Sequence, residues 1–230
     1  MAKRITSFLV ILLGIPAVIL GCMQFAESKQ YYLASVVIIA AALGGLFASL
    51  EKKKLTTREL AAIACTVAIA VIGRVALFML PQVKLTCAVV ILAAISFGPY
   101  VGFLCGSMSM LVSNIFMGQG THTPFQMFGM GLVALLCGLI FHKKAYGKNR
   151  WLVGITGGVL CFAVYGFIVD LCSVLFFTST STLAAALPIF ASGVSFNLVH
   201  GVTTGAALVI FTPYITSAFE RISKKYELFT

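Results

Sequence analysis

The sequence predicts an all-α integral membrane protein, and two observations carry that prediction. Of its 230 residues, 60% are hydrophobic and only 10% are charged, whereas a soluble domain carries about a quarter charged residues. The hydrophobic residues also fall into runs near the length of about 20 residues that a membrane-spanning helix needs. Too few charges remain to cover a surface that faces water, so a soluble enzyme or a soluble nucleic-acid-binding protein is excluded.

Eight apolar runs are predicted to form helices in the membrane. The fourth run is short, which leaves three arrangements open: a tilted helix, a re-entrant helix, or a helix joined to the fifth through Gly98-Pro99. The eighth run is long, and Pro213 is expected to break it near its end because proline lacks the N–H that a helix needs. The predicted spans are Thr6–Phe25, Tyr32–Leu50, Glu59–Leu80, Leu85–Phe97, Val101–Met117, Pro124–Phe141, Trp151–Phe177 and Pro188–Phe219.

The loops between these runs differ in basic charge, and the difference orients the chain. With the N-terminus in the cytoplasm, thirteen Lys and Arg residues lie on the inner side, only Lys29 and Lys84 lie outside, and Arg74 is within a span. Eight spans with both termini inside satisfy this pattern. We therefore predict a multi-pass protein of the cell membrane with cytoplasmic N- and C-termini.

The first run has an alternative interpretation. Ile19-Leu20-Gly21-Cys22 loosely resembles the cleavage box of a lipoprotein signal segment. The apolar run continues through this box to Phe25, which favours an uncleaved first helix. The seven cysteines, an odd number with no close pair at metal-ligand spacing, are interpreted as reduced packing residues. No metal site or cofactor is predicted.

Polar residues within the spans are costly and are therefore functional candidates. At a rise of about 1.5 Å per residue, they lie in the outer half of the membrane, while the inner halves are almost purely apolar. This distribution predicts a pocket that receives a solute from outside, rather than an ion path, which needs polar lining throughout. The candidate site residues are Arg74, Lys84, Asn114, Gln119, Thr121, His122, Gln126, Asp170, Asn197 and His200.

Each of these residues also has a purely structural explanation. Arg74 can extend outward to the membrane surface along its aliphatic stem, and Asp170 can serve only as its partner. Asn197 and His200 can form hydrogen bonds between helices.

The densest polar signal is the turn between the fifth and sixth spans. Gly118 and Gly120 permit a tight turn, and Thr123, which precedes Pro124, is predicted to be the N-cap of the next helix. A well-made turn does not explain the three long polar side chains at one mouth, Gln119, His122 and Gln126. Four neighbouring apolar side chains either line an apolar pocket or face lipid: Phe116, Phe125, Met127 and Phe128.

Small residues form one face of the third span near its inner end. Ala61, Ala64 and Ala68 lie on this face at helical spacing, and small residues let another helix approach closely in lipid. The face predicts docking onto a membrane partner. Generic packing within the chain is the alternative.

Most of residues 58–215 resembles the substrate-binding S components of energy-coupling factor (ECF) vitamin transporters. The resemblance departs at His122, where related sequences carry Trp. The landmarks are Gly73-Arg74, Pro81 to Lys84, Phe97-Gly98-Pro99 with Gly102-Phe103, Ser113-Asn114, Gly118-Gln119-Gly120, Thr123-Pro124-Phe125-Gln126-Met127 and Phe196-Asn197-Leu198-Val199-His200-Gly201.

The resemblance implies a six-helix core, residues 58–220, that binds a vitamin near its outer face. The face with Ala61, Ala64 and Ala68 would dock on a transmembrane coupling protein, and two cytoplasmic ATPases would drive import while the S component topples in the membrane. Residues 1–57, two helices and a basic loop, are additional to this core, and residues 221–230 form a cytoplasmic tail. The chain itself has no phosphate loop or ATPase motif.

Within the family, the chain looks most like the cobalamin-type members. A large ligand with many amides suits Gln119, Gln126 and Asn197 as hydrogen-bond partners. A small anionic vitamin such as pantothenate would instead use Arg74 and Lys84. Cobalamin or a related corrinoid is therefore the expected ligand, and a smaller vitamin is the alternative.

Two other classes remain as alternatives. An ion-coupled carrier or a small channel would work without ATPases, although the spans hold few carboxylates to bind a coupling ion. An intramembrane serine protease would pair Ser107 or Ser109 with His200. The Gly-x-Ser-Gly context that resembles rhomboid proteases is absent, and serines in membrane helices more often serve packing, so the chain is predicted not to be an enzyme.

Overall fold

The computed structural model describes residue 44 and residues 55–177 and 183–229; most of these residues are helical, and no strand occurs among them. Four helices are long and apolar enough to cross a membrane: Pro99–Met117, Thr123–Phe141, Arg150–Phe176 and Ala186–Tyr226. The predicted all-α membrane protein is thus confirmed. The predicted spans Thr6–Phe25 and Tyr32–Leu50, together with Cys22, lie outside the described residues.

The first helix of the described core, α3 (Thr57–Val75), begins at a capping box. The Thr56 hydroxyl accepts the Glu59 N–H at 3.3 Å, and the Glu59 carboxylate accepts the Thr56 N–H at 2.8 Å. Both are backbone N–H groups that have no acceptor within the helix at its start. The helix ends at Val75 rather than at the predicted Leu80. Beyond it, the Lys84 ammonium donates to the Leu77 carbonyl at 2.7 Å and fastens the loop that follows.

The short fourth run forms α4 (Thr86–Phe97), and a single residue, Gly98, joins it to α5 (Pro99–Met117). Gly98 has φ 114°, which residues with a side chain rarely adopt. Pro99 follows at the start of α5, where its fixed φ suits a helix. Of the three arrangements left open by the sequence, the joined helix is therefore the one observed.

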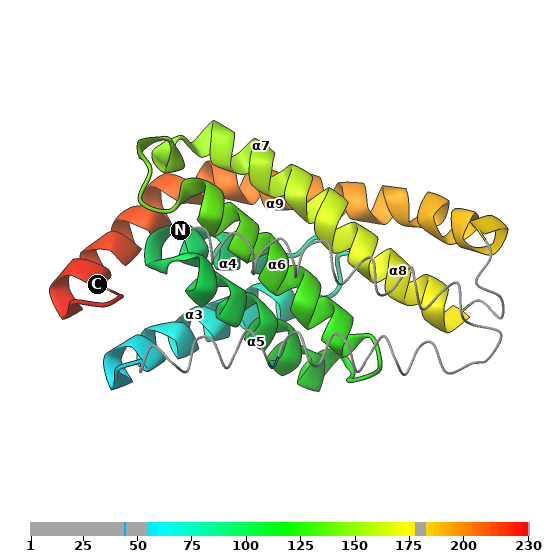
Figure 1. The fold of residues 1–230 in the computed structure, drawn as a ribbon, viewed down its shortest axis with the longest axis horizontal. Helices are drawn as coiled ribbons and strands as arrows, with labels where there is room; N and C mark the ends of the chain where they lie inside the picture. Colours follow the sequence, from blue (N-terminus) through cyan, green and yellow to red (C-terminus); the bar gives the residue numbers. More distant parts are fainter. Residues whose placement is uncertain (1–43, 45–54, 178–182, 230) are drawn as a thin grey trace.

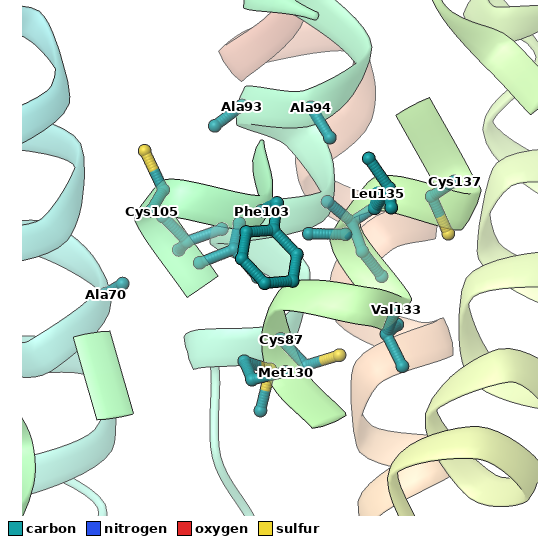
Figure 2. Close-up of a cluster of buried hydrophobic side chains, with 14 of the residues drawn as sticks. Ala70, Cys87, Ala93, Ala94, Phe103, Cys105, Met130, Val133, Leu135 and Cys137 are labelled. Atoms are coloured by element: carbon teal, nitrogen blue, oxygen red, sulfur yellow. The ribbon is translucent and has the colours of Figure 1, made fainter. Parts of the chain in front are cut away.

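Helix α4 lies at the centre of the core, and every one of its residues except Ser96 is buried. Figure 2 shows side chains of neighbouring helices packed together with those of α4, among them Ala70 of α3, Phe103 of α5 and Met130 of α6. Ala70, Phe103 and Met130 are fully inaccessible to solvent. Lipid is as apolar as these side chains, so close packing holds such a core together.

The sixth run forms α6 (Thr123–Phe141), and a short 3-10 helix (η1, Ala145–Lys148) leads into the next span. Thr123 is the first residue of α6, so its prediction as N-cap is wrong. Its hydroxyl accepts the Gly120 N–H at 3.2 Å and the Asn114 side-chain N–H at 3.0 Å. The hydroxyl thus stabilises the preceding turn and the end of α5 rather than the N–H groups of α6.

The predicted span Trp151–Phe177 is one continuous rod with a change of winding at its middle. It consists of α7 (Arg150–Leu160), a π-helical turn (η2, Cys161–Tyr165) and α8 (Gly166–Phe177). A π turn inserts extra backbone into a helix and often marks a functional site. Here it ends at Tyr165, a residue of the cavity described below.

The last helix, α9 (Leu183–Tyr226), runs without interruption through Pro188 and Pro213, so the predicted break at Pro213 is wrong. Helices in a membrane tolerate proline better than helices in water because neighbouring groups and local adjustments of the backbone compensate for the missing N–H. In Figure 1, α9 lies along α7 and α8 at one edge of the molecule, with α6, α5 and α3 below.

Candidate functional site

A cavity of about 550 Å³ opens between α3, α5, α6, α8 and α9, at the end of α3 that lies away from its N-terminus. Both apolar and polar side chains line the cavity. The apolar ones include Met110, Met117, Met130, Val169, Ile189 and Phe196. The polar ones include Arg74, Gln82, Lys84, Gln126, Asp170, Ser173, Ser192, Asn197 and His200.

Arg74 is a buried junction between three helices. From the last turn of α3, its guanidinium donates to the Ser113 hydroxyl and, at 2.7 Å, to the Asn114 side-chain oxygen, both on α5. A second nitrogen lies 3.5 Å from the Gln126 side-chain oxygen on α6. Asn114 closes the group by donating to Gln126 at 2.9 Å. Arg74 therefore does not extend outward to the membrane surface, and it presents a fixed positive charge to the cavity.

Lys84 brings a second positive charge to the same wall. Its ammonium donates to the carbonyls of Leu77 at 2.7 Å and Leu80 at 3.2 Å, which holds the α3–α4 loop against the cavity. Partial burial lowers the pKa of Lys84 below its ordinary value, and the nearby Arg74 charge lowers it further. The residue thus closes a loop and contributes charge to the cavity.

Asp170 of α8 and Asn197 of α9 form a pair on the opposite wall. The Asn197 side-chain N–H donates to one Asp170 carboxylate oxygen at 2.7 Å. Glycines make room for both: a Cβ at Gly193 would lie 2.6 Å from the Asp170 carboxyl carbon, and a Cβ at Gly166 would lie 2.6 Å from the Asn197 amide carbon. The partner of Asp170 is therefore Asn197, and no ion pair with Arg74 is formed.

His200 is the most deeply buried of the predicted site residues that line the cavity, with only 6% of its surface exposed. Its ring packs edge-on against the Tyr165 ring, with the centroids 5.3 Å apart. Its Nε2 atom is buried and has no hydrogen-bond partner within the described part of the chain. A buried nitrogen without a partner costs about 1–3 kcal/mol, so this atom is a ready contact for a polar group of a ligand.

Four of the predicted site residues lie away from the cavity lining. Asn114 is buried beneath it and acts through Arg74 and Gln126. Gln119 is exposed; its side-chain N–H donates to the Leu111 carbonyl of α5 at 2.8 Å, and its side-chain oxygen accepts the Thr123 hydroxyl at 2.9 Å. Thr121 and His122 are exposed in the same turn and line no part of the cavity.

The four aromatic and methionine residues near this turn neither all line the cavity nor all face lipid. Phe125, Met127 and Phe128 are buried in the core, while Phe116 is 69% exposed. The methionines that line the cavity are instead Met110, Met117 and Met130.

Tyr165 is a cavity residue that the sequence analysis missed. It is buried, and its hydroxyl donates to the Met110 sulfur at 3.9 Å. A tyrosine hydroxyl in mid-span was a usable signal, because a buried hydroxyl in lipid needs a partner. The cavity-lining Met110, Met130 and Phe196 carry no such signal, since apolar residues fill every span.

The Ser–His dyad that an intramembrane serine protease would need is not formed. The Ser107 hydroxyl donates to the Met127 carbonyl at 3.1 Å, and the Ser109 hydroxyl donates to the Cys105 carbonyl at 2.6 Å. Neither bonds to His200, so both act in helix packing. The described residues also contain no cluster of three or more His, Cys, Asp or Glu side chains that could hold a metal ion.

The predicted docking face is open to the surroundings. Ala61, Ala64 and Ala68 of α3 are exposed, as is Cys65 between them, whereas Ile63 and Val67 on the other side of the helix are buried in the core. Generic packing within the described chain therefore does not account for these alanines.

A family model described as ECF-type riboflavin transporter, S component, matches residues 54–217. No curated protein and no solved structure matches the chain. The match supports the predicted S-component class, whose members are substrate-binding transporter subunits rather than enzymes, but not the cobalamin-type subgroup. Since it covers most of the chain, including every helix that lines the cavity, the chain belongs to the S-component family of ECF-type riboflavin transporters.

Proposed function

We propose that this chain captures a vitamin from outside the cell in the Arg74–His200 cavity and delivers it inward while docked on a transmembrane coupling protein powered by two ATPases. The observation that carries the proposal is the cavity itself, which combines apolar walls with polar groups from several helices. Such a mixture is typical of small-molecule sites. Beneath it, the buried helix α4 offers no polar path onward, so passage requires a larger movement of the subunit.

Two arguments favour a flavin over a corrinoid as the vitamin. The family description names riboflavin. The cavity of about 550 Å³ also falls within the range of about 300–1,000 Å³ that drug-sized ligands occupy, and a corrinoid is several times bulkier than a flavin.

The chemistry of the cavity also suits a flavin. Its flat ring system has one apolar edge, for which the thioethers of Met110 and Met130 offer an adaptable surface. The other edge carries an N–H between two carbonyls, which matches the carboxylate of Asp170 and the amide of Asn197 as acceptor and donor. The unpartnered nitrogen of His200 would take a remaining carbonyl or a hydroxyl of the side chain.

Titration of the purified full chain with riboflavin, cobalamin and pantothenate tests the proposal. Riboflavin fluorescence should be quenched on binding, while the other two vitamins should neither bind nor compete. Binding of cobalamin alone would restore the corrinoid, and binding of pantothenate alone would point to Arg74 and Lys84 as anion ligands. Failure of all three would remove the proposed role of the cavity, and uptake by the chain without ATPases would identify an ion-coupled carrier.

A further inference from the structure

A second cavity, of about 460 Å³, opens at the other end of the molecule, between the ends of α4 and α6, the η1 loop and the last turns of α9. Asn197 lines the first cavity and Glu220 the second, and 23 residues of one helix separate them, or about 35 Å. The hydrocarbon core of a bilayer is about 30 Å thick. The two cavities therefore belong to opposite faces of the membrane, and the second lies at the predicted cytoplasmic face.

The second cavity is strongly positive. Lys143, Lys144, Lys148 and Lys224 all line it, and the one carboxylate among its lining residues is Glu220. Glu220 pairs with Lys148 at 3.2 Å. Three ammonium groups are left without a carboxylate among the lining residues.

A buried hydroxyl group also faces this cavity. Ser96 is the single residue of α4 that is not fully buried, and its hydroxyl oxygen is itself shielded from solvent yet has no hydrogen-bond partner within the described residues. A serine in a helix ordinarily bonds to the carbonyl one turn earlier. The neighbouring His142 does not serve it, because its Nδ1 atom lies 2.8 Å from the Ile95 carbonyl.

The rest of the lining suits a ligand that is only partly polar. Ile95, Phe141 and Ala145 form apolar walls beside the lysines. Trp151, just beyond the η1 loop, is 59% exposed, and exposed tryptophans are typical of the level of lipid headgroups. The positive-inside rule explains why lysines gather on this side of the membrane, but not why they surround a cavity with a buried, unpartnered hydroxyl.

We propose that this second cavity binds a phosphate-bearing anion, with the phosphate among Lys143, Lys144 and Lys224 and an oxygen within reach of the Ser96 hydroxyl. Basic pockets between helices on the cytoplasmic side bind anionic lipid headgroups, and a soluble phosphate ester offers the same chemistry. The proposal is independent of the vitamin that the first cavity takes.

The lipid source is tested with the full chain in nanodiscs of equal phosphatidylglycerol and phosphatidylcholine, with retained lipid counted by native mass spectrometry. The wild type should retain phosphatidylglycerol selectively. The double variant Lys144→Gln/Lys224→Gln should lose about tenfold in this retention, and Ser96→Ala should weaken it without any change in charge. The soluble source is tested by titrating glycerol 3-phosphate into the protein in phosphatidylcholine nanodiscs.

The matched control is Arg150→Gln/Lys225→Gln, which removes two charges at the same face from residues that do not line the cavity. Selective loss in the first double variant alone supports the site, with the lipid as ligand if retention changes and the soluble ester if only the titration does. Equal loss in both double variants would mean a diffuse surface charge and would overturn the proposal, as would the absence of any anion binding. Vitamin binding in the first cavity verifies that each variant is folded.

Discussion

Arg74 shows how one side chain can serve both the fold and the cavity. Its guanidinium contacts Ser113 and Asn114 of α5 and Gln126 of α6, and it remains part of the cavity wall. The guanidinium is planar and carries several N–H donors in a fixed geometry, so it can bind acceptors on two neighbouring helices at once. The sequence pointed to Arg74 because a charge in a span is costly, but not to the three acceptors that lower this cost.

Arg74→Gln is therefore expected to affect stability and vitamin binding together. Removal of the guanidinium leaves buried acceptors without donors, which should lower the free energy of unfolding by about 2 kcal/mol and weaken binding. Thermal unfolding in detergent and vitamin titration measure the two effects. Arg58→Gln, an exposed residue of the same helix, is the control and should change neither; an unaltered melting temperature in Arg74→Gln would contradict the junction role.

His200 provides a sharper test of ligand contact. If its buried Nε2 atom receives a polar group of the vitamin, His200→Ala should weaken binding by about tenfold, the value of one buried hydrogen bond. His122, the other histidine among the predicted site residues, is exposed and outside the cavity, so His122→Ala should bind normally. The opposite result in titration of the two variants would place the vitamin at the α5–α6 turn instead.

At the scale of the helices, the proposed docking face of α3 can be tested directly by transport. Ala64→Leu/Ala68→Leu adds bulk to an exposed face, so it should leave vitamin binding unchanged and abolish ATP-dependent uptake when the coupling protein and ATPases are present. Ala206→Leu adds the same group to an exposed position of α9 and should transport normally. Full uptake by the α3 variant would show that the partner docks elsewhere.

Helices α7 and α9 approach so closely that glycine is required between them. A Cβ at Gly158 would lie 2.9 Å from the Gly201 carbonyl oxygen, which is backbone and cannot move aside alone. Gly158→Leu should therefore separate the helices, lower the melting temperature by several degrees and weaken vitamin binding, because His200 adjoins the crossing. Its neighbour Val159 is 57% exposed, so Val159→Leu should melt like the wild type. Equal melting temperatures would show that the crossing relaxes without cost.

Helix positions followed from the sequence more reliably than helix ends. The lengths of the apolar runs predicted the helices from α5 onward, because in lipid every backbone N–H and C=O group must form its hydrogen bond within its own helix. The breaks depend on local partners instead. Pro213 lies inside α9 and does not end it, and the loop after the end of α3 at Val75 is held by Lys84, which lies nine residues farther along the chain.

The same division applies to the site across the whole molecule. Charged and amide residues in spans were visible because lipid makes them costly, and Arg74, Asp170 and Asn197 do line the cavity. The turn residues Gln119 and His122 were selected for local density alone. A local cluster of polar residues does not reveal whether other helices pack beside it to form a cavity. That depends on tertiary packing, including the packing of α9.

The segment that follows α9 contacts the first turn of α3. Beyond α9 the chain turns back, so that Leu228 is 3% and Phe229 is 9% exposed. The Phe229 N–H donates to the Glu59 carboxylate in the first turn of α3 at 2.8 Å, and its ring lies 5.0 Å from the Phe97 ring at the end of α4. This contact fixes the first turn of α3 to the core.

Phe229→Ala should therefore weaken the whole subunit and its docking, while the distant cavity remains intact. Loss of one buried aromatic side chain should lower the free energy of unfolding by about 2 kcal/mol, or about 4–8 °C in melting temperature for a chain of this size. At temperatures below melting, vitamin affinity should be unchanged and uptake reduced, because the first turn of α3 is freed beside Ala61 and Ala64. Phe116→Ala, which removes a ring that is 69% exposed, is the control for both measurements. If Phe229→Ala has a lower melting temperature but normal uptake, the contact stabilises the subunit without affecting docking. If its melting temperature equals that of the wild type, the expected contribution of the contact to stability is wrong.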